Sequence, residues 1–135
     1  MKIFLAYKFS GADKIHLKEV VELISETLTE LGHTTFCFNR DIQEWGKIEV
    51  SRKKIVPLAL ENLEKSDSIL AILEASTKST GMGIELGYAK ALGKKVYVIR
   101  NTENANDYIE SLADVIDTFD TINDLPDNLD RIFSI

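Results

Sequence analysis

Apolar residues in this chain alternate between short continuous runs and longer runs at helical spacing. The continuous runs predict buried β-strands at residues 2–7, 33–38, 68–73, 95–99 and 116–119. The helical spacing predicts helices at residues 17–31, 51–65, 81–92, 108–115 and 125–133. Gly32 and Gly93 supply C-terminal stops, and Pro57 either kinks the second helix or marks its late start.

Five strands that alternate with helices predict a doubly wound α/β fold. The apolar runs lack polar alternation, which indicates a parallel sheet covered by helices on both faces, a three-layer sandwich. In such a sheet a ligand binds beyond the carboxyl ends of the strands, where the strand order reverses. This rule selects the loops at residues 7–13, 39–50 and 74–83. Asp67 precedes its strand, so we expect it at the opposite edge as a structural cap.

Length and charge limit the function classes. A chain of 135 residues with 44% apolar content fits one domain, residues 1–135, with a proper core. A net charge of −6 disfavours polynucleotide and anionic membrane partners. Neither a membrane-spanning run nor a signal-peptide pattern is present, so we expect a cytoplasmic protein.

The few metal-ligating side chains predict no metal site. Cys37 is the single cysteine, which excludes an internal disulfide and a cysteine cluster, and its apolar neighbours indicate a buried strand thiol. A whole helix separates His16 from His33, and neither has an acidic cluster at ligand spacing. We therefore expect neither a metal ion nor a cofactor.

The run Gly-Met-Gly-Ile-Glu-Leu-Gly-Tyr-Ala at residues 81–89 carries the strongest candidate chemistry. Gly81 and Gly83 open a helix, and Glu85 lies one turn inside it. Glycines let backbone approach a ligand closely, and a helix start offers unpaired N–H groups and a positive dipole end. Glu85 would face whatever binds there. The alternative is a glycine-rich helix cap with a solvated glutamate.

This motif is followed by Gly-Lys-Lys-Val at residues 93–96 and preceded by the strand at 66–73. The combination resembles the nucleoside 2-deoxyribosyltransferase family, including relatives that hydrolyse deoxynucleoside monophosphates at the N-glycosidic bond. The resemblance implies a single flavodoxin-like domain in which Glu85 attacks or stabilises the anomeric carbon as the base leaves. It also implies a nucleoside or nucleotide as substrate and a homodimer or higher homo-oligomer.

The same resemblance suggests a substrate-binding set. Ser79 stands where transferases tend to carry an aspartate and monophosphate hydrolases a serine, which favours a 5′-phosphorylated substrate. Phe9 stands where relatives often stack an aromatic ring on the base, and Lys8 would add positive charge or remain a solvated surface lysine. The other predicted substrate-binding residues are Tyr7, Gly81, Met82 and Gly83.

Two departures from the family pattern concern the partners of Glu85. Ala59 stands where many members have an acidic residue, and Phe4 where several have a tyrosine. The candidate acids or orienting groups are then Asp41 and Glu44, in the loop after the second strand, and Asn62, one helical turn beyond Ala59. In the same loop, Trp45 either contacts the base or packs on the first helix or in a subunit interface.

Three functions follow from these observations. The first is cleavage or transfer at the N-glycosidic bond of a nucleoside or its 5′-monophosphate. Residues 2–7 and 10–13 also resemble the start of a TIR domain, which suggests an NAD glycohydrolase as the second. Ala59 and Phe4 motivate the third, a non-catalytic nucleotide-binding or signalling module.

Overall fold

A computed structural model describes residues 1–7, 14–74, 80–101 and 107–134 of the chain. Five strands form one parallel sheet in the order β2-β1-β3-β4-β5. The strands are β1 (Lys2–Tyr7), β2 (Thr34–Cys37), β3 (Ser68–Leu73), β4 (Lys95–Asn101) and β5 (Val115–Phe119). The α-helices are α1 (Lys14–Glu30), α2 (Phe38–Asp41), α3 (Arg52–Glu64), α4 (Thr80–Ala91), α5 (Asp107–Glu110) and α6 (Leu125–Phe133). Short 3₁₀ turns are η1 (Glu44–Gly46) and η2 (Ile122–Asp124).

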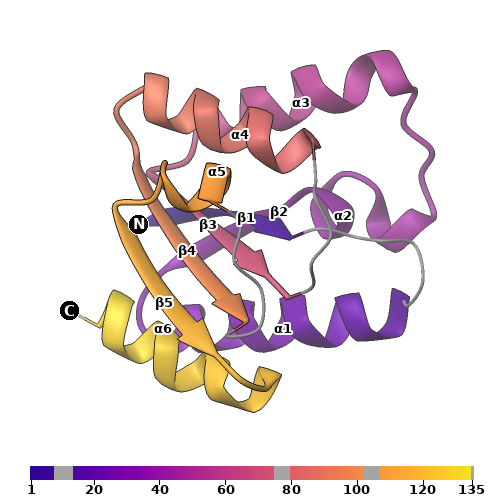
Figure 1. Cartoon of the computed structure of the whole chain (residues 1–135). Helices are drawn as coiled ribbons and strands as arrows, with labels where there is room; N and C mark the ends of the chain where they lie inside the picture. Colours follow the sequence, from indigo (N-terminus) through magenta and orange to yellow (C-terminus); the bar gives the residue numbers. More distant parts are fainter. Residues whose placement is uncertain (8–13, 75–79, 102–106, 135) are drawn as a thin grey trace.

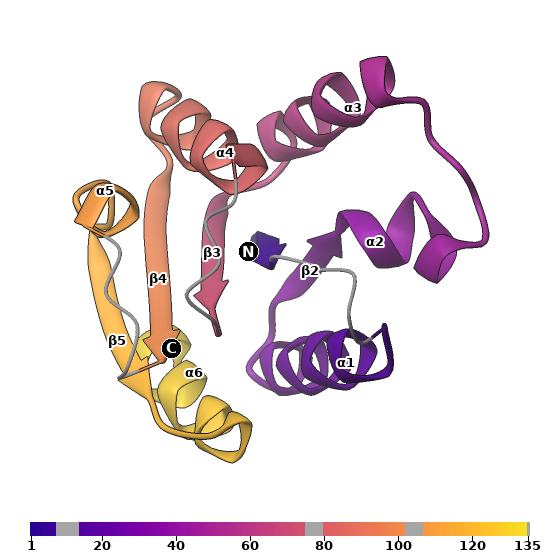
Figure 2. The same ribbon diagram turned by 45° about the vertical axis from the view of Figure 1, so that its right-hand side comes forward.

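The sheet lies between two helix layers, as the sequence predicts. In Figure 1, α3, α4 and α5 lie above the sheet and α1 and α6 below it, and the turned view in Figure 2 keeps these layers apart. We call the apolar cluster between the sheet and α1 and α6 the lower core, and the cluster between the sheet and α3 and α4 the upper core. The flavodoxin-like, doubly wound three-layer fold is therefore confirmed.

Two of the predicted elements need correction. The helix predicted at 108–115 is only the single turn α5, because the backbone N–H of Asp114 donates to the Val96 carbonyl (2.8 Å) and its carboxylate accepts from the Val96 N–H (2.8 Å). This double tie to β4 ends the helical turn and starts β5 at Val115. Phe38, predicted as strand, begins α2, so β2 is shorter than expected.

Helix α3 begins at Arg52, with Ser51 as its N-cap residue, and contains Pro57 in its interior. The late-start alternative for Pro57 is therefore wrong.

Burial explains the apolar strand runs: every residue of β3 is buried, as both faces of a central parallel strand must be. Of the helices that the structure describes, none is long and apolar enough to cross a membrane.

The edge of the sheet opposite the predicted ligand loops is fixed by Asp67. Its carboxylate accepts a hydrogen bond from the Lys2 backbone N–H (2.7 Å), and its own N–H donates to the Lys2 carbonyl (2.8 Å). The prediction of a structural cap at Asp67 is confirmed.

Replacing Asp67 by alanine should therefore lower the free energy of unfolding by about 1 kcal/mol, because the Lys2 N–H loses a charged acceptor while staying near solvent. Urea unfolding followed by circular dichroism measures this change. Glu61→Ala is the control: its ion pair with Lys65 is exposed on both sides, so its loss should change stability by less than about 0.5 kcal/mol. Equal effects of the two substitutions would contradict the capping role.

Gly87 lies inside α4, and a Cβ atom built there meets nothing within 4 Å. Neither packing nor an unusual backbone conformation requires glycine at this position. Gly87→Ala should therefore raise the free energy of unfolding by roughly 0.5 to 1 kcal/mol, since it reduces the entropy of the unfolded chain without a clash. The same urea titration tests this, and a loss of stability would show that the helix needs the bare backbone.

Candidate active site

The candidate site lies at the carboxyl edge of the sheet, between β1 and β3. These strands are neighbours, with Tyr7 paired to Ile72 near their ends. From β1 the chain proceeds to α1 in the lower layer, and from β3 to α4 in the upper layer (Figures 1 and 2). The strand order reverses between these two strands, which is where doubly wound folds form their ligand crevice.

Glu85, the predicted catalytic carboxylate, comes from the upper helix layer. It lies on α4, one turn beyond the helix start, and its side chain is half-buried. Within the described part of the chain, no group donates a hydrogen bond to it or forms an ion pair with it. Burial alone raises the pKa of Glu85 to about 7. Near neutral pH the carboxyl is therefore divided between its acid and ionised forms.

The glycine turn before Glu85 is anchored by Met82. Its side chain is 3% exposed and belongs to the upper core, whereas Gly81 beside it is exposed. A Cβ atom at Gly83 would meet nothing within 4 Å, so packing within the chain does not require this glycine. The open space at Gly83 is compatible with the predicted close approach of a ligand to this backbone.

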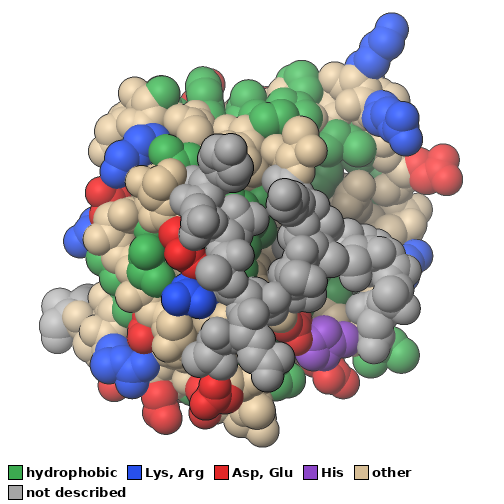
Figure 3. Space-filling model, in the orientation of Figure 1, with side chains coloured by type: hydrophobic (Ala, Val, Ile, Leu, Met, Phe, Trp, Pro, Cys, Tyr) green, Lys and Arg blue, Asp and Glu red, His purple; other side chains and the backbone are tan. Residues whose placement is uncertain are grey.

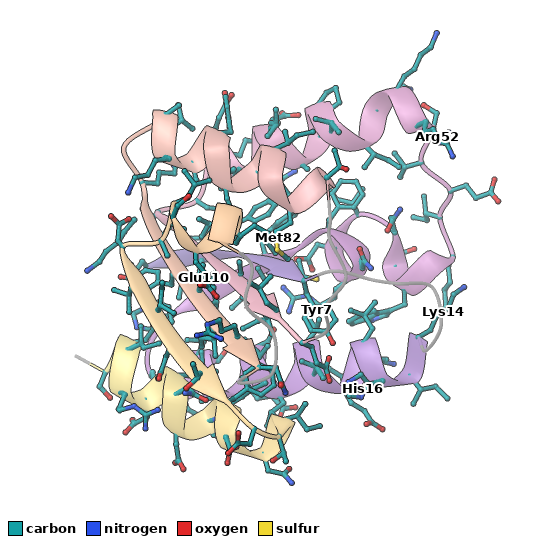
Figure 4. All side chains as sticks on the ribbon, in the orientation of Figure 1. Tyr7, Lys14, His16, Arg52, Met82 and Glu110 are labelled. Carbon is teal, nitrogen blue, oxygen red and sulfur yellow. The ribbon has the colours of Figure 1, made fainter. Side chains whose placement is uncertain are left out.

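Tyr7 ends β1 and packs, half-buried, against the lower core. In Figure 4 the labelled side chains of Met82, Tyr7 and His16 follow one another from the upper helix layer to the lower one. The structure thus brings the end of β1 and the starts of α4 and α1 to one edge of the sheet. Lys8, Phe9 and Ser79, predicted to bind substrate, lie outside the described residues.

Two of the three candidate acids or orienting groups already bond within their own segments. The Asp41 carboxylate accepts from the Cys37 N–H (2.9 Å) and from the Arg40 guanidinium (2.8 Å). Although burial opposes it, these bonds hold the pKa of Asp41 below its ordinary value, so the group stays ionised and is a poor proton donor. The Asn62 amide donates to the Leu58 carbonyl of its own helix (2.9 Å). Glu44 is exposed on the surface.

The two positions that depart from the pattern of the resembled family are apolar and buried. Ala59, on α3, is 5% exposed, and Phe4, on β1, is 1% exposed with its ring centroid 5.3 Å from that of Phe36. Cys37 is buried at the end of β2, and burial raises the pKa of its thiol, which confirms the buried strand thiol. The described residues hold no cluster of three His, Cys, Asp or Glu side chains that could bind a metal ion.

The loop after β2 packs Trp45 against the lower core, with the Lys18 ammonium 5.9 Å from the ring centroid. Of the alternatives for Trp45, packing on the first helix is the one that the structure shows. Glu44 and Trp45 have left-handed backbone angles, with φ of 47° and 60°. A pocket of about 350 Å³ separates this loop from α1, and Lys14 and Leu17 line its helix side.

His16 forms a pair that the sequence analysis missed. Its Nε2 atom contacts the Oε1 atom of Glu74, the residue that directly follows β3. Figure 3, drawn in the orientation of Figure 4, shows a histidine side chain at the surface of this face with acidic side chains beside it. Around α1, His16 lies about 160° from Lys14 and about 100° from Leu17, the two helix residues that line the pocket. The pair thus lies on the β3 side of α1.

A second ion pair at the same edge joins Arg100 of β4 to Glu110 of α5, with 2.7 Å between Nε and Oε1. Arg100 pairs in register with Leu73, which ends β3, so the pair lies one strand away from Glu74. Glu110 is labelled in Figure 4. The positive charge of Arg100 is thus already neutralised by a half-buried carboxylate.

The fold is that of a doubly wound α/β protein, a class that binds small molecules where the strand order reverses. The sequence model of the nucleoside 2-deoxyribosyltransferase family matches residues 3–129, so the chain belongs to this family. The chain is accordingly an enzyme of glycosyl transfer or cleavage on nucleosides or nucleotides. A comparison with curated protein sequences gives no match.

Solved structures agree with this assignment. The 2-deoxyribosyltransferase of Bacillus psychrosaccharolyticus is 27% identical, with a TM-score of 0.67 over 93% of this chain and 90% of that one. The CMP N-glycosidase of Clostridium botulinum is 20% identical, with a TM-score of 0.71 over 97% and 99%. A conserved protein from Enterococcus faecalis V583 is 22% identical, with a TM-score of 0.71 over 97% and 98%. The last two likenesses concern the fold.

Proposed function

We propose that this enzyme breaks the N-glycosidic bond of a deoxynucleoside 5′-monophosphate or deoxynucleoside, with Glu85 as nucleophile or as stabiliser of the oxocarbenium-like sugar. The observation that carries the proposal is the isolation of Glu85. Its side chain is half-buried on α4, the helix that follows β3, and no group among the described residues donates a hydrogen bond to its carboxylate. A carboxyl kept without a partner costs stability, which is typical of a group that acts on a ligand.

The chemistry suits such a carboxylate. As the bond between the anomeric carbon and the base breaks, positive charge builds on the sugar. A fixed anion in a partly desolvated site stabilises that charge more strongly than the same anion in water, and it can also capture the carbon covalently. Water then completes hydrolysis, or a second base completes transfer.

A 5′-phosphate is the substrate feature that we propose for the start of α4. This helix has twelve residues, begins at Thr80, and exposes Gly81 in its first turn. Unpaired N–H groups and the positive dipole end of a helix favour an anion. The sequence places Ser79 directly before this turn, where a hydroxyl can donate to a phosphate that a carboxylate would repel.

Release of free base, separated by liquid chromatography, tests the proposal. The substrates are the four deoxynucleoside 5′-monophosphates, the corresponding deoxynucleosides, and NAD. We expect base release from at least one monophosphate, with kcat/KM at least about tenfold higher than for its nucleoside. Nicotinamide release from NAD alone would favour the TIR-like alternative. Tight nucleotide binding in calorimetry without base release would favour a binding module.

A further inference from the structure

The pair formed by His16 and Glu74 joins the start of α1 to the end of β3. His16 lies in the first turn of α1, and Glu74 is the first residue after β3. Their side chains are partly exposed, 36% for His16 and 25% for Glu74, so the pair can exchange protons with solvent. The pair connects residues 58 positions apart at the edge of the sheet where Tyr7 also ends its strand.

The two faces of β3 assign this pair and the helix that carries Glu85 to opposite layers. Leu70 and Ile72 belong to the lower core, and Leu73 belongs to the upper core. Because side chains alternate between the faces of a strand, Glu74 is directed to the lower layer, consistent with its contact to α1. Glu85 comes from α4 in the upper layer. A sugar held at the end of β1 and β3 would therefore lie between the two.

This opposition is the arrangement that cleavage of a glycosidic bond needs. The nucleophile approaches the anomeric carbon from the side opposite the leaving base, and the base leaves readily only when it is protonated. An acid for the base must therefore lie on the other side of the sugar from Glu85. In the upper layer the family's acidic position is Ala59, which has no proton to give.

We infer that His16 is the general acid that protonates the leaving base, and that Glu74 is the positioning residue that orients it. This inference rests on the proposed function. The bond from the anomeric carbon to the base nitrogen breaks, its electron pair goes to the base, and the imidazolium of His16 gives that base a proton. Glu85 meanwhile forms a bond to the anomeric carbon or stabilises its charge. In hydrolysis, water then bonds to the anomeric carbon, any bond to Glu85 breaks with its electron pair returning to the carboxylate, and the water gives its proton to the neutral imidazole, which restores the starting state.

Glu74 contributes by orienting the imidazole. Burial raises the pKa of Glu74 above its ordinary value. Its contact with Nε2 also fixes the orientation of the imidazole, as carboxylates do for catalytic histidines in other enzymes.

The test compares leaving groups that need an acid with leaving groups that do not. Deoxyguanosine 5′-monophosphate releases guanine, whereas its N7-methyl derivative already carries a positive charge on the base. We expect His16→Gln to lower kcat for guanine release by about 10² to 10⁴-fold and kcat for N7-methylguanine release by less than about threefold. Glu74→Gln should show the same selectivity with a smaller loss. If the enzyme releases only pyrimidines, uracil is the leaving base that needs an acid and 5-nitrouracil is the one that does not.

The other possible results separate failure of the inference from failure of the proposed function. Equal losses for both bases in His16→Gln would show that the pair only supports the structure, and would overturn the inference. An unchanged rate for both bases would overturn it as well. Glu85→Gln should lose both activities equally, since its role does not depend on the leaving group. Failure of the unaltered protein to release either base, or any base in the wider panel, would instead reject the proposed function, and this inference with it.

Discussion

Glu85→Gln is expected to lower kcat for base release by about 10³-fold or more, with little change in the affinity for substrate. Glutamine has nearly the volume of glutamate, so binding contacts remain, but its neutral amide neither attacks the anomeric carbon nor stabilises positive charge on the sugar. The interaction that disappears is one made mainly in the transition state, which lowers kcat rather than raising KM. Single-turnover base release measures the chemical step, and calorimetric titration with substrate measures binding.

Glu61→Gln is the matched control for this substitution. Glu61 lies on α3 in the same helix layer, and its side chain is exposed, with only an ion pair to Lys65. The control variant should keep the full rate. If Glu85→Gln retained more than about a tenth of the rate of the unaltered protein, Glu85 would be removed from the chemical mechanism.

Most of the fold could be predicted because the patterns that indicate strands and helices lie within short segments of the sequence. Continuous apolar runs and helical spacing are properties of neighbouring residues, and they placed β3 and α6 at the bounds that the structure has. The prediction of a helix at 108–115 was wrong because a contact from outside the segment decides its end. Asp114 bonds twice to Val96, eighteen positions away, and no periodicity within the segment indicates this tie.

The site was only partly predictable for the same reason. The motif at residues 81–89 identified Glu85, but the burial that raises its pKa to about 7 depends on how α4 packs on the sheet. Glu74 had a signal, since it opens one of the selected loops at the end of a strand. His16 had none, because it lies inside a predicted helix and its partner is distant in sequence.

Asp41 shows the converse case. Its sequence position, in a loop at the carboxyl edge of the sheet, made it a reasonable acid candidate. The neighbouring Arg40 and the backbone of Cys37 occupy its oxygens and lower its pKa, which favours a structural role. A carboxylate with such partners differs physically from Glu85, whose oxygens have none among the described residues. Sequence alone does not separate the two, because the difference lies in hydrogen bonding and burial.

The same substitution of Glu85 should also stabilise the protein at alkaline pH. The pKa of Glu85 is about 7 in the folded protein and near the ordinary value of 4.5 when the chain is unfolded. The folded state therefore holds a proton that the unfolded state has already lost between these values, so stability falls as pH rises from about 4.5 through 7. At about 1.4 kcal/mol per pH unit, the ionised, desolvated carboxylate costs at most about 3.5 kcal/mol above pH 7.

Glutamine carries no charge at any of these pH values, so Glu85→Gln should avoid this cost. We expect the variant to exceed the unaltered protein in free energy of unfolding by about 2 to 3 kcal/mol near pH 8.5, and to differ from it by much less near pH 4.5. Urea unfolding at both pH values measures the two differences. Comparing them cancels any contribution of the amide that is independent of pH, and Glu61→Gln should show no such pH dependence. A constant difference between the two pH values would contradict the raised pKa.

The two results for Glu85→Gln are informative together. A variant that loses activity because it misfolds becomes less stable, whereas removal of a costly functional carboxylate gives a protein that is both inactive and more stable. If Glu85→Gln is inactive and less stable near pH 8.5, the loss of turnover reports damage to α4 and says nothing about the mechanism. If it is inactive and more stable, the free energy spent on an unpaired carboxylate at the switch point is explained by its action on the substrate.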